Sequence, residues 1–325
     1  MKKIITLTAA LSLLAASSVA NASTTRHIIV NDQSVSSSSD FTPIVENGRA
    51  LVPLRVVADA LDASVAWDAK SRTASVRKWS DSIVFKAGSK TATAVYGNVS
   101  PDPQTVALDT EVIVRRDRVY VPLRMIAHSL GYLVDLRGNG SILLQSPLSR
   151  SDRELLATGK LSDARMFVKT KGVMNARYAN IPTMYPSEGR EGFAATFLFP
   201  AGEANRFFLV AGDTAAFYEL KGGFFVITWR ALIPLGNKDE LRLFMDRMFT
   251  KATGKYPADL VGKIFFYFTN SSIVTSERRE AGQIAADGTI TRLGIKWTIG
   301  EEVKEQSGSL ALVAPDETRN EVRLP

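Results

Sequence analysis

The chain has 325 residues, 45% of them hydrophobic, and a formal charge of +7 at pH 7. This length allows two domains that each bury a core of their own. The basic residues form no block or stripe, which excludes nucleic acid as a partner. The mild positive excess fits ordinary solubility, and it also fits attraction to the anionic polymers of a cell wall.

The chain has no cysteine and only two histidines, His27 and His128, both in its first half. The second half therefore offers no Cys/His protease site, no serine triad with histidine, no zinc site with nitrogen ligands and no copper site. His128 falls in the middle of a predicted helix, where a surface or core histidine is a simpler interpretation than a metal ligand. We predict no catalytic residue, no metal site and no cofactor.

The first 22 residues have the three parts of a secretory signal peptide. They begin with a positive segment, Met1-Lys2-Lys3, continue with an apolar run at 4–16, and end in Ala20-Asn21-Ala22, an A-x-A cleavage site before Ser23. The apolar run is shorter than the roughly 18 residues that a membrane-spanning helix needs. We therefore expect a secreted, extracellular or cell-surface protein, cleaved between Ala22 and Ser23, with no membrane span after signal removal.

The tetrapeptide Val-Pro-Leu-Arg occurs twice, at 52–55 and again 69 residues later at 121–124. When residues 44–61 are compared with residues 113–130, nine of eighteen positions are identical. A match of this density indicates an internal repeat, in which one supersecondary unit has been duplicated.

Each copy of the repeat has the pattern of a β-hairpin that leads into a helix. Two short apolar strands flank a turn, and proline then occupies the first helical position, where its fixed φ fits and its missing N–H costs nothing. Apolar residues follow at the i, i+3, i+4, i+7 spacing of a half-buried helix, and a second hairpin comes after it. The residues predicted to be buried are Leu54, Val57, Leu61, Leu123, Ile126 and Leu130, with Trp67 covering one edge of the core.

These residues resemble the copper amine oxidase N-terminal-like domain, also called the stalk domain, over about residues 27–146. The resemblance rests on the run from Gly48 to Arg55, on Val65-Ala66-Trp67-Asp68 and on the return of the motif at Arg118. It implies an antiparallel sheet packed on helices, in a non-catalytic module of secreted or surface proteins from Gram-positive-type bacteria. Despite its name, the family implies no copper in this domain. The motif residues are Pro53, Leu54, Arg55, Trp67, Pro122, Leu123 and Arg124.

Residues 147–158 are predicted to form a linker and a short helix, which a capping box from Ser151 to Glu154 opens. Residues 159–325 then alternate aromatic and β-branched runs with Gly, Pro, Asn and Asp, the pattern of an antiparallel β domain. We find no family resemblance in this part. The predicted fold class is therefore α+β: a duplicated hairpin-helix-hairpin domain of the stalk type, followed by a mainly antiparallel β domain with one or two helices.

Four details of the second domain follow from its pattern. The runs at 166–168 and 310–313 are interpreted as strands, and Asp287-Gly288 is the clearest hairpin turn. One helix is predicted from Asn237 to Gly254, because an acidic cap precedes an apolar stripe at helical spacing. That stripe has the composition of a ligand groove, but a helix that packs on a sheet needs the same residues for its core.

The sequence favours a secreted or cell-surface non-enzymatic protein, in which a stalk-type module presents a C-terminal binding domain. The expected partner is a cell-wall polymer or another extracellular protein. The alternative is a carboxylate-based hydrolase of wall or extracellular polysaccharide, with the stalk domain as targeting module. A copper-dependent oxidase is disfavoured because it needs a histidine-rich site. Candidate acids for the hydrolase are Glu188, Glu191, Asp213, Glu219, Asp239 and Glu240, in a cleft lined by Trp229, Tyr218 or Tyr267.

The first testable expectation concerns export. The protein secreted by an expressing bacterium should begin at Ser23, because signal peptidase cuts after an A-x-A site. N-terminal sequencing of the exported material measures this directly. Exported protein that retains Met1 would show that residues 1–22 are not a cleaved signal.

Overall fold

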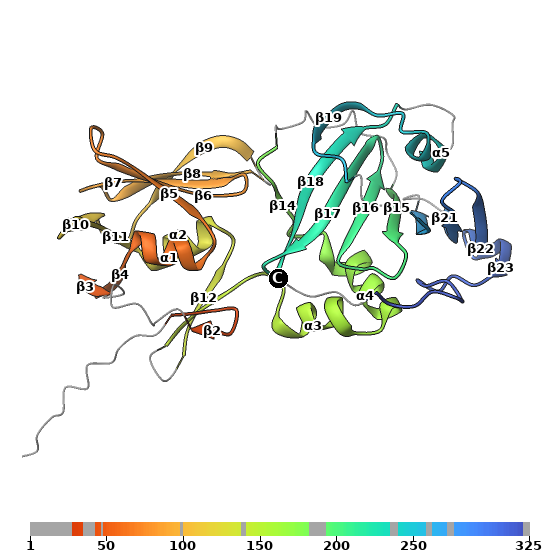
Figure 1. The fold of residues 1–325 in the computed structure, drawn as a ribbon, viewed down its shortest axis with the longest axis horizontal. Coiled ribbons are helices and arrows are strands. Elements are labelled where there is room, and N and C mark those ends of the chain that lie inside the picture. Colours follow the sequence, from red (N-terminus) through yellow and green to blue (C-terminus); the bar gives the residue numbers. More distant parts are fainter. Residues whose placement is uncertain are drawn as a thin grey trace, which may run out of the picture.

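The computed structural model describes residues 28–34, 43–46, 48–97, 100–137, 141–181, 193–234, 240–257, 262–271 and 276–320. These residues form two lobes, the first from β1 to β13 with α1 and α2, and the second from α3 to β23 (Figure 1). The expected cleavage site at Ala22 and Ser23 lies outside the described residues. None of the described helices has the length and apolar character needed to cross a membrane.

Two stretches of the first lobe contain the same order of elements. The first stretch consists of β3 (Ile44–Glu46), β4 (Arg49–Pro53), α1 (Leu54–Ala60), β5 (Ser64–Asp68) and β6 (Thr73–Lys78). The second consists of β10 (Ile113–Arg115), β11 (Arg118–Pro122), α2 (Leu123–Ser129), β12 (Leu133–Leu136) and β13 (Ile142–Gln145). Pro53 and Pro122 are N-caps with φ of −60°, one position before the one predicted, because this φ suits the end of a strand as well as the start of a helix.

The two tetrapeptides pair with each other in one sheet. Strand β4 is antiparallel to β11, and Val52 lies opposite Val121, its own counterpart 69 residues later. The flanking pairs are Leu51 with Pro122 and Pro53 with Tyr120. The register is therefore symmetric about the Val52–Val121 pair, which is the arrangement of a two-fold contact between like surfaces.

The remaining strands of the first lobe extend two strand pairs, β5–β6 and β12–β13. Strands β7 (Asp81–Lys86), β8 (Thr91–Tyr96) and β9 (Ser100–Ala107) continue the sheet that β5 and β6 begin, while β1 (Ile28–Val30) and β2 (Gln33–Ser34) extend the β12–β13 pair. Between these sheets lie both helices. All six helical residues predicted to form the core are buried there. Trp67, in contrast, keeps 40% of its surface exposed.

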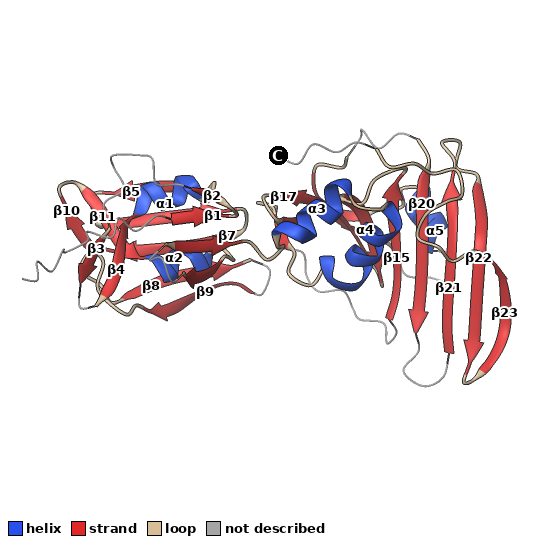
Figure 2. Ribbon diagram, turned by 90° about the horizontal axis from the view of Figure 1, so that it is seen from below, coloured by secondary structure: helices blue, strands red, loops and turns tan. Residues whose placement is uncertain are grey.

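The second lobe is built on one large, mainly antiparallel sheet, as predicted, and among its described strands only β14 runs parallel to a neighbour, β18. Helix α3 (Arg150–Thr158), helix α4 (Leu161–Phe167) and a π-helical turn (Val168–Gly172) lie over one face, and α5 (Glu240–Met245) lies on the other (Figure 2). The strands are β14 (Arg177–Tyr178), β15 (Phe193–Pro200), β16 (Arg206–Ala211), β17 (Thr214–Lys221), β18 (Phe224–Leu232), β19 (Thr250–Gly254), β20 (Ile264–Ser271), β21 (Ser276–Ile284), β22 (Ile290–Ile299) and β23 (Glu302–Gly308).

Several local predictions for this lobe were wrong. The capping box at α3 uses Ser149 and Asp152, because Ser149 is the residue whose hydroxyl accepts from the N3 backbone. Residues 166–168 are helical, since Leu161, Ala164 and Val168 form a buried stripe on the sheet.

Two further predictions failed in the later part of the lobe. Helix α5 ends at Met245, and Gly254 belongs to β19. Residues 310–313 do not form a strand. Leu312 is buried in the core, but this segment has no strand pairing with a neighbour. The Asp287-Gly288 turn is confirmed, with Gly288 at a φ of +83° and Asp287 accepting a hydrogen bond from the Thr289 N–H.

A buried ion pair ties the C-terminal segment to the second lobe. Arg165 of α4 is fully buried, and its Nη2 lies 2.5 Å from Oε1 of Glu317. Its guanidinium carbon lies 4.9 Å from the ring centres of both Phe199 and Phe265. Burial alone raises the pKa of Glu317, but the hydrogen bonds and charge of Arg165 outweigh it and hold that pKa below its usual value.

The two lobes share an aromatic contact. Phe224, at the start of β18, is buried with Val226 in the core of the first lobe. The Phe224 ring meets Trp79 and Tyr132 edge-on, at centroid distances of 5.0 and 5.1 Å. Edge-to-face contacts of this kind add to the stabilisation that comes from burial of the ring.

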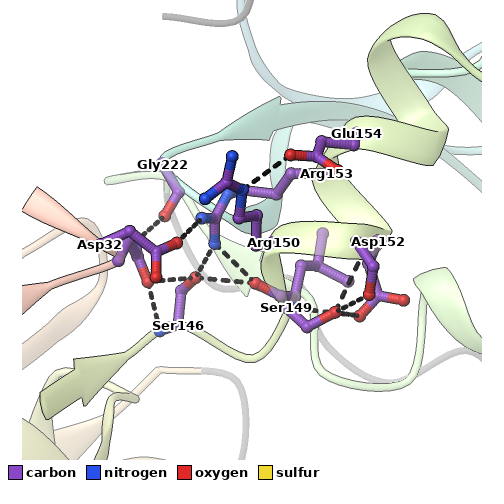
Figure 3. Close-up of polar contacts among 11 residues, drawn as sticks. Asp32, Ser146, Ser149, Arg150, Asp152, Arg153, Glu154 and Gly222 are labelled. Carbon is purple, nitrogen blue, oxygen red and sulfur yellow. Dashed lines mark hydrogen bonds and ion pairs between the residues drawn. The ribbon is translucent and has the colours of Figure 1, made fainter.

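Polar contacts also join the two lobes, and Figure 3 shows those around Ser146 and Arg153. Asn31 donates a hydrogen bond to the carbonyl of Gly222 and accepts one from the Ser146 N–H, at 3.3 and 2.8 Å. Arg153 of α3 pairs with Asp32 at 3.3 Å. Gly223 is needed here, because a Cβ at this position would lie 2.0 Å from the Ser146 hydroxyl oxygen.

An ion pair completes the joint between the lobes on its other side. Arg177 of β14 lies 3.2 Å from Asp81 of β7, whose carboxylate also accepts a hydrogen bond from the Gly97 N–H. Burial raises the pKa of Asp81, and the nearby Arg177 offsets this only in part. Next to it, the Ser80 N–H donates to the carbonyl of Tyr178 at 3.0 Å.

The core of the first lobe makes a quantitative expectation possible. The change Leu130→Ala should lower the free energy of unfolding by about 2–5 kcal/mol, because a fully buried leucine leaves a cavity. Urea denaturation of the chain without residues 1–22 measures this. The matched control is Leu133→Ala, three residues away and 64% exposed, which should change stability by less than about 0.5 kcal/mol. Equal effects of the two changes would show that α2 does not face the core.

Candidate binding site

A groove of about 1000 Å³ runs beside α1 in the first lobe. Residues from both stretches of the repeat line it: α1 and β5 on one side, and the β10–β11 hairpin on the other. The lining residues are Pro53, Leu54, Arg55, Val56, Asp59, Ala60, Val65, Trp67, Ala74, Val114, Arg116, Asp117, Arg118 and Val119. We call this feature the motif groove.

The floor of the motif groove is apolar and its rim is charged. Trp67 and Val114 expose 40% and 41% of their surfaces, far more than a closed core would allow. Three arginines at the rim, Arg55, Arg116 and Arg118, face solvent. Two exposed carboxylates, Asp59 and Asp117, also belong to the lining and leave it with a net charge of +1.

The turn that carries Arg116 and Asp117 is unusual for its sequence. Both residues have positive φ, 50° and 58°, as the two central residues of a type I′ hairpin turn do. The first copy of the repeat has Asn47-Gly48 in the same place, the pair that this turn prefers. A side chain such as arginine costs about 1–2 kcal/mol in this backbone region. The second copy therefore gives up stability to place two charged side chains at the groove.

The structure separates the predicted motif residues into two groups. Pro53, Leu54, Arg55 and Trp67 come together in the motif groove. Pro122, Leu123 and Arg124 belong to the other copy and are not among the residues that line it. Sequence reasoning missed the β10–β11 side of the groove, although the replacement of Asn-Gly by Arg-Asp in aligned turns was a visible signal.

The alternative reading as a hydrolase required a cleft lined by aromatic residues and carboxylates. Trp229, Tyr218 and Tyr267 are all buried in the core of the second lobe. Asp213 is buried in a turn and accepts a hydrogen bond from the Thr214 hydroxyl, and Glu219 pairs with Lys221. The other candidates, Glu188, Glu191, Asp239 and the side chain of Glu240, lie outside the described residues.

The described residues do not fit a copper site. His128 lies on the exposed side of α2, and His27 falls outside the described part of the chain. Within that part, no group of three or more His, Cys, Asp or Glu side chains is close enough to hold a metal ion. Copper(II) sites in proteins rely on imidazole and thiolate ligands, and the described residues of this lobe include one histidine and no cysteine.

A comparison with known protein families finds a match in the first lobe. Residues 29–143 match the family model described as the Copper amine oxidase N-terminal domain. This confirms the resemblance that the repeated motif indicated. The match ends before the second lobe. No curated protein and no solved structure matches the chain.

The family name and the ligand set disagree, which leads to a measurable expectation. Copper(II) titrated into protein without residues 1–22 and without a purification tag should bind weakly and be removed by a mild chelator. The double variant His27→Ala/His128→Ala should give the same calorimetric titration, because two imidazoles without a thiolate leave a copper(II) ligand set incomplete. Tight one-to-one binding that the double variant loses would contradict this expectation.

Proposed function

We propose that the protein is a secreted or cell-surface binding protein without enzymatic activity, and that its motif groove binds an anionic glycopolymer of the bacterial wall. In this proposal the two hairpin-helix-hairpin units are copies of one ancestral unit. The first lobe carries the groove, and the second lobe is the domain that it presents. The observation that carries the proposal is the exposed Trp67 beside three arginines in one groove.

The chemistry of the groove supports this class of ligand. An exposed indole ring has an apolar face on which a sugar ring can stack, while the edge of the indole stays in contact with water. The guanidinium groups of Arg55, Arg116 and Arg118 present planar sets of donors that match phosphate and carboxylate oxygens. A polymer that alternates sugars with anionic groups satisfies both features at once.

The strained turn supports a binding role as well. Residues in left-handed backbone conformations concentrate at ligand sites, where the surrounding structure holds them in place. Arg116 and Asp117 have this conformation at the rim of the groove. A purely structural hairpin would keep the Asn-Gly pair that the other copy uses.

Sedimentation with purified walls tests the proposal. The chain without residues 1–22 should bind walls that retain their phosphate polymers, and it should bind less to walls from which acid has extracted them. The change Trp67→Ala should weaken binding by about tenfold, the equivalent of roughly 1.4 kcal/mol. Higher salt should also weaken binding, because exposed charges are screened.

The repeat supplies a matched control. Arg55→Ala should weaken binding severalfold, while Arg124→Ala, the same change at the equivalent position of the other copy, should leave it unchanged. Equal binding by the wild type, Trp67→Ala and Arg55→Ala would contradict a role for the groove. Release of reducing sugar from the walls during the assay would contradict the non-enzymatic assignment.

A further inference from the structure

The second lobe has an open basin on the face of its sheet that carries α5. The Phe244 ring of α5 meets Phe208 of β16 edge-on at a centroid distance of 5.0 Å, and Leu243 belongs to the same apolar cluster. Next to this contact, residues of β15, β20, β21 and β22, together with Leu241 of α5, line a hollow of about 410 Å³. We call this hollow the sheet basin.

Strand register explains which side chains meet in the sheet basin. Residues directly opposite each other on neighbouring strands point to the same face, so each row across four strands contributes to one surface. The three rows are Leu198–Phe266–Gly282–Arg292, Thr196–Phe268–Glu280–Ile295 and Ala194–Asn270–Arg278–Trp297. A register shift between Ala281 and Gly282 brings Arg292 into its row. Most of these residues line the basin.

The floor of the basin contains buried polar groups where a covered sheet would be apolar. Thr196 is 3% exposed and Glu280 is 7% exposed, and both line the basin together with Leu241 of α5. Burial of a carboxylate is costly unless charged partners compensate it. Glu280 has two such partners.

Two arginines hold the Glu280 carboxylate from opposite sides. Nε of Arg278 lies 2.7 Å from Oε1, and Nε of Arg292 lies 3.3 Å from Oε2. The cluster of three groups has a net charge of +1. Each guanidinium has five N–H donors, and both side chains remain about half exposed. Glu280 therefore fixes two cationic groups that still have donors directed away from it.

An exposed aromatic ring lies next to this cluster. Trp297 is directly opposite Arg278 on the neighbouring strand and keeps 37% of its surface exposed. Ile299, two residues further along the same face, is 39% exposed. The apolar surface of Trp297 and Ile299 therefore lies beside the two arginines, next to the residues that line the basin.

We propose that the sheet basin binds an acidic saccharide, with the sugar carboxylate between Arg278 and Arg292 and the ring on Trp297. Net positive charge selects an anionic ligand, and the paired guanidinium groups match the two oxygens of a carboxylate. An extended peptide fits less well, because a peptide gains most of its hydrogen bonds at a free sheet edge, and the basin strands β15, β20, β21 and β22 are each paired on both sides. This site is independent of the motif groove.

Calorimetric titration with a defined galacturonate oligosaccharide tests the proposal. The chain without residues 1–22 should bind the acid and should bind its neutral methyl ester at least about tenfold more weakly, since the charged hydrogen bonds are lost. Arg292→Met keeps most of the side-chain length but removes the charge, and it should weaken binding of the acid by a similar factor. Trp297→Ala should do the same.

Control variants separate this site from others. Arg150→Met removes an arginine that is also exposed and paired with one glutamate, but that lies on α3, and it should leave binding unchanged. Trp67→Ala in the motif groove should also have no effect. Loss of binding in Trp67→Ala with retention in Trp297→Ala would overturn the proposal in favour of the groove. Equal binding of the ester, or of a polyglutamate peptide of matched length, would overturn the choice of ligand.

Discussion

The pairing of β4 with β11 around Val52 and Val121 determines the organisation of the first lobe. Both helices leave this strand pair at a proline, so the register of the pair fixes where α1 and α2 begin. A shift of one residue would turn the buried side chains of both strands to the opposite face. The same pairing brings the β10–β11 hairpin next to α1, and the motif groove exists because of that proximity.

The two stretches that carry the repeated motif have the same order of elements but differ in sequence at several aligned positions. Trp67 in the first copy corresponds to Leu136 in the second, and the turn pair Asn-Gly corresponds to Arg116-Asp117. Core positions such as Leu61 and Leu130 are identical in type and equally buried. Packing requires similar residues in the two interiors, whereas the exposed positions differ, and one groove combines an aromatic residue with three arginines.

The sequence predicted the features that depend on local chemistry and periodicity. Proline placement and the i, i+3, i+4, i+7 stripe located both helices of the first lobe, and the Asp287-Gly288 turn located a hairpin of the second. Features that depend on contacts between residues far apart in the sequence could not be predicted. Nothing in the local pattern shows that Phe224 packs between Trp79 and Tyr132, or that β10–β11 faces Trp67.

The errors have the same origin. Residues 166–168 have strand-like composition, but they extend a helix whose buried stripe packs on the sheet. Glu280, Arg278 and Arg292 form a cluster only because of strand register and a bulge. In each case tertiary contacts decided an outcome that composition left open.

The ion pair between Arg165 and Glu317 spans 152 residues of sequence and has a consequence for the order of assembly. During synthesis the N-terminal part of a chain appears first, and domains fold as their residues become available. Until Glu317 is available, Arg165 would have to be buried between Phe199 and Phe265 without its paired carboxylate, which is strongly unfavourable. The second lobe therefore reaches its final packing only after the chain through Glu317 is available, whereas the core of the first lobe takes Ala179, Phe224 and Val226 from the described part of the second lobe.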